Sequence, residues 1–416
     1  MKFYKIFIWF IIVILSFNYI VFADDENEDI FNNVSSLVEV SSDITNEPTI
    51  NSRAAIIYDR ISGSILYGKK ENEKRKMAST TKIMTAIIVL ENAKLDDIVT
   101  VSSKAAGTGG SRLGLHTNDK ISVRDLLYGL MLCSGNDAAV ALAEHVGSNL
   151  SGFADLMNKK CDSLGLTSTH FVTPHGLDNE EHYTTAYELA IITNYALKNQ
   201  TFCNYVGTKN YTVSINGKQK NLSNTNELLG NLNGVYGVKT GFTNGANRCL
   251  VTSVKRGNMD LICIVLGADT KKDRTKDSVQ LIEYAYKNFE MINIREKVIT
   301  EFENWKLCNS SSFIVRKGRS NDVNVILKEL PFDFFPVNCN HINDVSIYIY
   351  CNTTFDAPLE ANTSIGYLTV SVQNQNVLSL DIYNSNSISQ KDYIHFWKDM
   401  IKNYTSYLET LLYKNI

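Results

Sequence analysis

Three short segments of this sequence carry the side chains that acyl transfer on a serine requires. Ser79-Thr80-Thr81-Lys82 places a hydroxyl and an amine three residues apart, Ser134-Gly135-Asn136 supplies a second hydroxyl and an amide, and Lys239-Thr240-Gly241 supplies a second amine. A serine hydroxyl becomes an effective nucleophile when a neighbouring base accepts its proton. A serine followed three residues later by a lysine occurs by chance in many proteins, so the indication comes from the three segments in this order.

The first segment lies where an apolar helix is expected to begin. Residues 81–90 are strongly apolar at helical spacing. Lys82 then lies one turn after Ser79 on the same face, so its amine can reach the hydroxyl. Apolar surroundings would lower the pKa of the Lys82 amine, and the amine of Lys239 would lower it further. We therefore expect Lys82 to act as the base; the alternative is a helix N-cap followed by a surface lysine.

In their wider context these segments resemble the low-molecular-weight penicillin-binding proteins that act as D-alanyl-D-alanine carboxypeptidases. The resemblance implies an enzyme without a cofactor that removes the terminal D-alanine from peptidoglycan stem peptides through an acyl-enzyme on Ser79. It also implies inhibition by β-lactams. The resemblance covers residues 53–387 and rests on residues 77–86, 133–139 and 237–243, with similar segments at 174–178, 182–187, 224–226 and 356–359.

The resemblance assigns a role to each matching residue. The expected catalytic residues are Ser79, Lys82, Ser134 and Asn136, and the expected substrate-binding residues are Lys239, Thr240, Gly241, Phe242 and Arg274. Ser79 would be the acylated nucleophile, Lys82 its base and Ser134 a proton relay to the leaving amine, while Asn136 would hold the substrate's amide. Lys239, Thr240 and Arg274 would bind the terminal carboxylate. The backbone N–H groups of Ser79 and Phe242 would form the oxyanion hole.

Two positions depart from the family pattern. Asp269 stands where a basic or neutral residue is common, and Ala246-Asn247-Arg248 replaces an Ala-Gly pair. Arg248 is therefore an alternative basic contributor to carboxylate binding beside Arg274.

A cluster of histidines raises the alternative of a zinc peptidase. His170, His175, Asp178 and His182 lie close together in the chain. Histidine ligands on a helix usually stand four residues apart, whereas these spacings run through Pro174 and Gly176 and are typical of a loop. We expect no metal.

A β-lactamase, a D,D-endopeptidase and a silent wall-binding protein are further candidate classes for this sequence. A β-lactamase needs a positioned carboxylate that activates water for deacylation, and no glutamate between the second and third segments lies in a matching context. A D,D-endopeptidase passes through the same acyl-enzyme, so the motifs leave it open. A catalytically silent wall-binding protein would have no reason to keep Ser79, Lys82, Ser134, Asn136 and Lys239 together.

The composition and the N-terminus indicate an exported globular protein. The chain has 416 residues, 44% of them hydrophobic, and a formal net charge of −3, which offers no basic surface for nucleic acid. A basic start, an apolar run and a small-residue site predict a signal peptide over residues 1–23, with an uncleaved anchor as the alternative. The eight cysteines leave disulfide pairing open.

The remaining pattern predicts an α+β fold with an added β domain. A flexible leader is expected over residues 24–49, and the catalytic domain over residues 50–294, as an antiparallel sheet with a helical lobe. Apolar runs at 54–58 and 64–67, and at 249–254 and 261–266, have turn residues between them and predict two β-hairpins. Residues 125–146 are expected to form one helix. Short alternating strands over residues 295–388 predict a small all-β sandwich. Residues 389–416 predict an amphipathic helix that docks on a membrane surface or, with equal weight, packs on the β domain.

Overall fold

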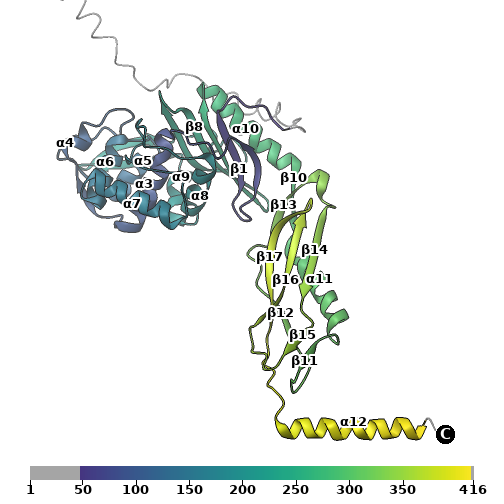
Figure 1. Cartoon of the computed structure of the whole chain (residues 1–416). Helices are drawn as coiled ribbons and strands as arrows, with labels where there is room; N and C mark the ends of the chain where they lie inside the picture. The colour runs from purple at the N-terminus through teal and green to yellow at the C-terminus, as the bar shows by residue number, and fades with distance from the viewer. Residues whose placement is uncertain (1–46, 414–416) are drawn as a thin grey trace, which may run out of the picture. The chain divides into compact units, whose positions relative to one another are not determined.

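The structure, a computed structural model, describes residues 47–413. The chain divides into two compact units, and it passes from the first to the second between Asn288 and Phe289 (Figure 1). The division lies six residues before the predicted boundary at residue 294. The predicted signal peptide, and the predicted leader up to residue 46, lie outside the described residues.

The first unit is built on a five-stranded antiparallel sheet with the order β2-β1-β9-β8-β7. Its strands are β1 (Ala54–Asp59), β2 (Ile65–Lys69), β7 (Val235–Thr243), β8 (Asn247–Arg256) and β9 (Met259–Ala268). Both predicted hairpins, β1-β2 and β8-β9, are present. All ten residues of β9 are buried, as expected of an apolar strand inside a sheet. The strand that carries the third motif, β7, lies at the edge.

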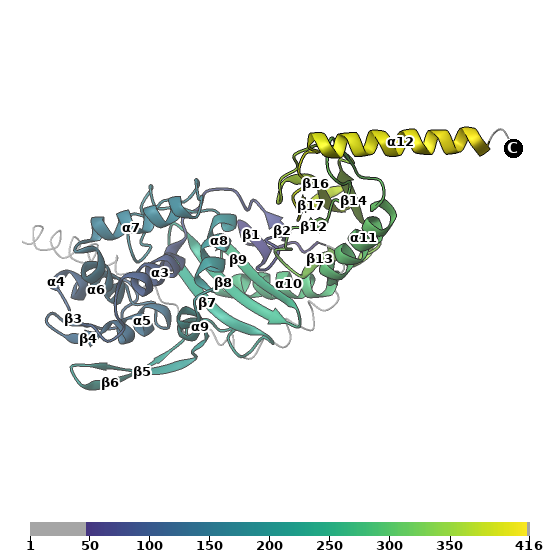
Figure 2. The ribbon, with the colours of Figure 1, turned by 90° about the horizontal axis from the view of Figure 1, so that it is seen from below.

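A helical lobe lies beside this sheet (Figures 1 and 2). Its helices are α3 (Lys82–Asn92), α5 (Val123–Met131), α6 (Asn136–Gly147), α7 (Leu150–Ser163), α8 (Ala186–Ala196) and α9 (Gln200–Gly207). Smaller elements are the 3₁₀ helix η2 (Ala78–Thr81), α4 (Ser103–Ala106) and the hairpins β3-β4 (Ile98–Thr100, Lys120–Ser122) and β5-β6 (Asn210–Ile215, Lys218–Ser223). Helix α10 (Lys271–Asn288) contacts β8 and β9, on the side of the sheet away from the lobe in both views. One apolar core joins the sheet and the lobe helices.

The prediction of one helix over residues 125–146 was wrong, because the chain breaks between α5 and α6. Ser134 has a φ of +60°, and Gly135 caps the next helix with non-helical angles. A left-handed residue ends an α-helix. Both helices contribute residues to the same apolar core, so the apolar pattern runs through the break and concealed it from the sequence.

The second unit contains the predicted β domain. A four-stranded sheet has the order β12-β17-β16-β14, formed by β12 (Val325–Leu327), β17 (Gln375–Asn384), β16 (Ser364–Val372) and β14 (Val345–Cys351). Two smaller sheets pair β10 (Phe289–Asn293) with β13 (Phe334–Asn338), and β11 (Ile314–Arg316) with β15 (Thr354–Asp356).

Two helices complete the second unit. Helix α11 (Ile294–Asn309) was not predicted, and it packs Ile294, Val298 and Phe302 into the core of the β domain. The predicted C-terminal helix is present as α12 (Tyr393–Tyr413). Within residues 47–413, no helix combines the length and the apolar character of a membrane span.

Candidate active site

The first motif forms the centre of the candidate site. Ser79 lies in η2, and Lys82 begins α3 directly after it. The Lys82 Nζ atom lies 2.8 Å from Oγ of Ser79, 2.7 Å from Oδ1 of Asn136 and 3.1 Å from the carbonyl oxygen of His175. The two oxygens of Asn136 and His175 are acceptors only. They take the two N–H groups of a neutral amine, so its lone pair is left for the hydroxyl of Ser79.

Burial favours the neutral form of the Lys82 amine, which is the form that can accept a proton. Its side chain is fully buried. Desolvation lowers the pKa of Lys82 well below its usual value, and the positive charge of Lys239 lowers it further. The sequence predicted apolar surroundings for Lys82, and the structure shows its side chain fully buried.

The second motif lies at the break between α5 and α6. Asn136 begins α6, and its Nδ2 donates to the carbonyl oxygen of Gly109 at 2.7 Å. This bond orients the amide so that Oδ1 faces Lys82. Ser134 is 6% exposed, and its position follows from the left-handed backbone that separates the two helices. Asn136 thus holds Lys82 by a hydrogen bond, in addition to the substrate contact expected of it.

The third motif reaches the site because β7 passes directly over η2. A Cβ atom on Gly241 would lie 3.1 Å from the backbone nitrogen of Ser79 and 3.2 Å from the carbonyl oxygen of Met77. Only glycine allows this close approach without a shift. It brings the backbone next to Phe242 beside the N–H group of Ser79, where an oxyanion hole is expected.

Two further residues of β7 line the same region. Lys239 is 1% exposed, and its amine donates to the carbonyl oxygen of Thr240 at 3.1 Å. The hydroxyls of Thr240 and Thr225 are 2.7 Å apart. The structure therefore brings the lysine of the third motif close enough to influence Lys82, and it fixes the threonine beside it.

The histidine cluster supports the site structurally. Among residues 47–413 there is no group of three or more side chains suited to a metal ion. The His182 Nε2 atom lies 2.8 Å from Oγ1 of Thr81, and its Nδ1 accepts from the N–H of Val172 at 3.0 Å. Burial lowers the pKa of His182 to about 4 and that of His175 to about 3. Both imidazoles are therefore neutral near pH 7.

The sequence did not predict that the loop containing His175 contacts Lys82 through a backbone carbonyl oxygen. Gly176 has a φ of +85°, and a Cβ atom there would lie 1.9 Å from the carbonyl oxygen of Ala78. The loop thus rests against η2, and the hydroxyl of Thr85 donates to the carbonyl oxygen of Pro174 at 2.6 Å. The sequence contained one indication of this contact, the glycine that follows Pro174-His175. A tight turn that packs against another backbone segment requires a residue without a side chain.

Asp137 is a second functional residue that the sequence reasoning missed. Its buried carboxylate accepts from the N–H groups of Leu113, Gly114 and Leu115 at 2.8, 2.7 and 3.0 Å. It thereby fixes the segment after Gly109, whose carbonyl oxygen orients Asn136. Nothing in the sequence joined residues 109–115 to the second motif.

The structure gives Arg274, which was predicted to bind the substrate carboxylate, a buried acidic partner. Arg274 is 3% exposed, on α10, and forms an ion pair with the equally buried Glu227. Glu227 also accepts from the hydroxyl of Thr275. Among the described residues, no hydrogen bond or ion pair joins Arg274 to Ser79 or Lys82. Its guanidinium is already paired, so direct binding of the substrate carboxylate would compete with this ion pair.

The two unusual positions near the third motif have separate partners. The guanidinium of Arg248 lies 3.8 Å from the centre of the Phe242 ring, which is a cation–π contact. Asp269 pairs with Arg53 at 2.9 Å, with both side chains about half exposed. Arg248 is therefore a basic group beside Phe242, which is expected to contribute to the oxyanion hole, whereas Asp269 forms a surface ion pair.

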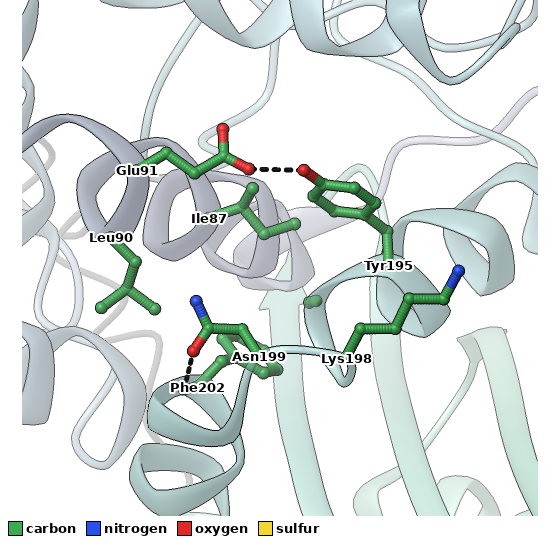
Figure 3. A pocket seen from close by; sticks show the side chains of 8 residues that line it. Ile87, Leu90, Glu91, Tyr195, Lys198, Asn199 and Phe202 are labelled. Atoms are coloured by element: carbon green, nitrogen blue, oxygen red, sulfur yellow. Dashed lines mark hydrogen bonds between the residues drawn. The ribbon is translucent and has the colours of Figure 1, made fainter.

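A separate cavity lies between α3, α8 and α9. It has a volume of about 300 Å³, and its lining includes Ile87, Glu91, Tyr195 and Phe202 (Figure 3). The hydroxyl of Tyr195 donates to Glu91 at 2.7 Å, as the dashed line in Figure 3 shows. None of the predicted site residues lines it, so this cavity is distinct from the candidate active site.

Comparisons with known proteins agree with this geometry. A family model described as D-alanyl-D-alanine carboxypeptidase, peptidase family S11, matches residues 41–270. The D-alanyl-D-alanine carboxypeptidase DacF of Bacillus subtilis is 31% identical over 87% of this chain and 92% of its own length.

Two solved structures resemble this fold. Penicillin-binding protein 5 from Haemophilus influenzae matches 83% of this chain and 99% of its own, with 28% identity and a TM-score of 0.69. The DD-transpeptidase of Streptomyces K15 matches 58% of this chain and 99% of its own, with 37% identity and a TM-score of 0.56. The first match extends into the β domain, whereas the second has a length close to that of the first unit alone.

Proposed function

The chain belongs to the D-alanyl-D-alanine carboxypeptidase family and is a serine-type enzyme of that class, and from this premise we propose how its residues act. Ser79 is the nucleophile and Lys82 the general base. The substrate is the D-alanyl-D-alanine end of a peptidoglycan stem peptide, and free D-alanine is the first product. The observation that carries this assignment is the hydrogen-bonding of Lys82, whose two N–H groups have carbonyl acceptors while its lone pair faces Ser79.

In the acylation step, one proton leaves Ser79 and an ester bond to Ser79 replaces the peptide bond to the terminal D-alanine. The hydroxyl proton of Ser79 passes to Nζ of Lys82 as Oγ bonds to the carbonyl carbon of the penultimate D-alanine. The N–H groups of Ser79 and Phe242 stabilise the oxygen that becomes negative. The C–N bond then breaks, and Ser134 relays the proton from Lys82 to the leaving amine. Water hydrolyses the Ser79 ester with Lys82 again as base, which restores the enzyme.

The terminal carboxylate is bound by charge at the third motif. Lys239 supplies a buried positive charge, and the hydroxyl of Thr240 can donate a hydrogen bond. Arg274 acts through its ion pair with Glu227 rather than by touching the substrate, and Arg248 adds positive charge beside Phe242. β-Lactams carry a carboxylate and a reactive amide in the same arrangement, so they would acylate Ser79 and remain attached.

The experiment that tests this function is incubation with a pentapeptide that ends in D-alanyl-D-alanine. We expect stoichiometric release of free D-alanine and a tetrapeptide product, and no release by Ser79→Ala. Cleavage of cross-linked muropeptides without release of D-alanine from the pentapeptide would instead identify an endopeptidase.

We also propose that the protein is exported and that α12 binds the membrane surface. The support for export is the basic and apolar pattern of residues 1–23. The support for membrane binding is the exposure of large apolar and aromatic side chains along α12, such as Phe396 at 63%, Ile401 at 60% and Tyr404 at 63%. Lys398 and Lys402 add positive charge, which favours an anionic lipid surface.

A further inference from the structure

The four-stranded sheet of the second unit has one face in the core and one toward solvent. Inward residues of the sheet, among them Leu368 and Val370, are buried with Phe302 of α11. Alternate positions carry Tyr350 and Tyr367, which are 51% and 46% exposed. Two large aromatic side chains that lie together in solvent contribute little to a core, and adjacent exposed apolar groups mark interaction sites.

The two tyrosines belong to a row of side chains that crosses three strands. Tyr350 on β14 is directly opposite Tyr367 on β16, and Tyr367 is directly opposite Asp381 on β17. The two rings are stacked, with their centres 5.0 Å apart. Because neighbouring strands are separated by about 4.8 Å, the row is about 10 Å long. Figure 1 shows the three strands side by side.

A hollow of about 700 Å³ lies along this row. Its polar groups come from Asp381, Asn352 and Ser364. Lys328, 3.5 Å away, and the hydroxyl of Tyr383, at 3.1 Å, hold the carboxylate of Asp381. Within the described part of the chain, no lysine or arginine lines the hollow itself.

This combination of groups selects the chemical class of the ligand. Tyrosine rings offer flat apolar faces with partial negative charge, and the C–H groups on the face of a sugar ring fit against them. A carboxylate, an amide and a hydroxyl around the rings can pair with hydroxyl and acetamido groups. The charge of Asp381 is compensated by Lys328, and no lysine or arginine of the described residues lines the hollow, so anionic ligands such as phosphate or a phospholipid headgroup find no cationic partner in its lining.

We propose that this hollow binds the glycan strand of peptidoglycan, a chain of β-linked N-acetylated amino sugars. The inference rests on the proposed function, since the stem peptides that the active site would cleave are attached to that polymer. The row of Tyr350, Tyr367 and Asp381 has a length that accommodates a disaccharide. Binding the strand would raise the effective concentration of stem peptides at the active site.

The test measures binding of the full chain to glycan that carries no peptide. The probes are a soluble tetramer of N-acetylglucosamine and glycan strands from which an amidase has removed the stem peptides. We expect Tyr350→Ala/Tyr367→Ala to weaken binding at least roughly tenfold in calorimetry, since two aromatic contacts are lost. Tyr404→Ala, which removes an exposed ring of α12, should bind like the wild type.

A second variant separates loss of the site from loss of folding. Asp381→Asn keeps the shape of the side chain and removes its charge, and we expect weaker glycan binding with an unchanged Tm. Equal affinity of wild type, double variant and Asp381→Asn would overturn the inference. Turnover of a soluble pentapeptide is measured in parallel. Turnover without glycan binding would contradict the inference and support the proposed function. Glycan binding without turnover would support the inference and contradict the proposed function.

Discussion

The amine of Lys82 is held by two carbonyl acceptors and lies beside a second buried amine. Desolvation and Lys239 both favour its neutral form, which is the form a general base needs. Asn136 and His175 orient the amine, so its lone pair points to Ser79. At the scale of single residues, the proposed mechanism therefore depends on the protonation state of Lys82, which its surroundings shift toward the neutral form.

Removing this base should abolish most of the acylation rate. We expect Lys82→Ala to lower the second-order rate of acylation by a fluorescent penicillin by about 10²–10⁴. Lys104→Ala, at an exposed position, should react like the wild type. In the wild type the rate should fall as the pH drops through the lowered pKa of Lys82, since the ammonium accepts no proton. A rate independent of Lys82 would require another base.

We expect the buried ion pair of Arg274 and Glu227 to stabilise the folded protein. Glu227→Gln leaves the buried guanidinium of Arg274 without a charged partner, so we expect the free energy of unfolding in urea to fall by about 3–5 kcal/mol. Arg316→Ala, in a pair whose side chains are 63% and 67% exposed, should cost less than about 1 kcal/mol.

The same pair tests whether Arg274 binds the substrate carboxylate directly. Arg274→Ala should be destabilised in the same way, and it should slow turnover of a free and an amidated D-Ala-D-Ala peptide to a similar degree. An unchanged stability, together with a selective loss of the substrate that has a free carboxylate, would instead place Arg274 in direct contact with the substrate. Parallel measurements on Arg248→Ala show whether that arginine discriminates the carboxylate.

At the scale of elements, the site is assembled where four segments meet at η2. The start of α3, the break before α6, the edge strand β7 and the loop of residues 172–178 each contribute a group to Ser79 or Lys82. Two of these segments approach η2 through glycine, at Gly176 and Gly241, because a larger side chain would meet backbone atoms.

His182 should make the attachment of the loop depend on pH. The pKa of His182 is lowered to about 4 in the folded protein, whereas the unfolded value is near 6.5. Below about pH 6.5 the unfolded chain binds the proton first, so stability should fall between about pH 6.5 and 4, by roughly 3 kcal/mol from this group. We expect His182→Gln to flatten that slope in urea unfolding at a series of pH values. His116→Gln, at a highly exposed site, should retain it, and an unchanged slope in His182→Gln would contradict the assignment.

The sequence predicted the elements whose periodicity is uninterrupted and missed those that depend on tertiary contacts. The hairpins β1-β2 and β8-β9 have apolar runs with turn residues between them, and both were predicted. The break at Ser134 was not, since a left-handed backbone at a serine has no signature in the pattern. Helix α11 was missed because residues 295–388 were assigned as a whole to an all-β domain, although Ile294, Val298 and Phe302 stand four residues apart.

The sequence predicted the part of the candidate site that lies in the three motifs. Residues of all three motifs meet at Ser79, as the resemblance implied. Asp137 and the carbonyl oxygen of His175 were not foreseen, because their roles depend on contacts between segments distant in the chain. Arg274 was assigned from its position after the third motif, and its buried partner Glu227 gave no signal in the sequence.

At the scale of the whole molecule, the chain joins a complete catalytic unit to a second unit with surfaces of its own. The first unit contains every group that the proposed reaction needs. The second unit carries the hollow at Tyr350 and Tyr367 and the exposed apolar residues of α12. We infer that the second unit serves to hold the enzyme at its substrate polymer and at the membrane.

The role of α12 is tested by vesicle binding. We expect the full chain to co-sediment with anionic phospholipid vesicles and a chain ending at Ser389 to remain in the supernatant, since the exposed apolar residues are removed. Leu307→Ser, at a 79% exposed site on α11, should bind like the wild type. Equal sedimentation of the full and shortened chains would remove the anchor role and favour packing of the helix on the β domain.

The most direct test of the central claim is the intact mass of the protein after incubation with benzylpenicillin. If Ser79 is the acylated nucleophile, the wild type gains the mass of one penicillin molecule, because ring opening adds the whole inhibitor. Ser79→Ala, with an unchanged fold, gains none. A penicillin adduct of the same mass and stoichiometry on Ser79→Ala would contradict the account, since the nucleophile would then be a different residue.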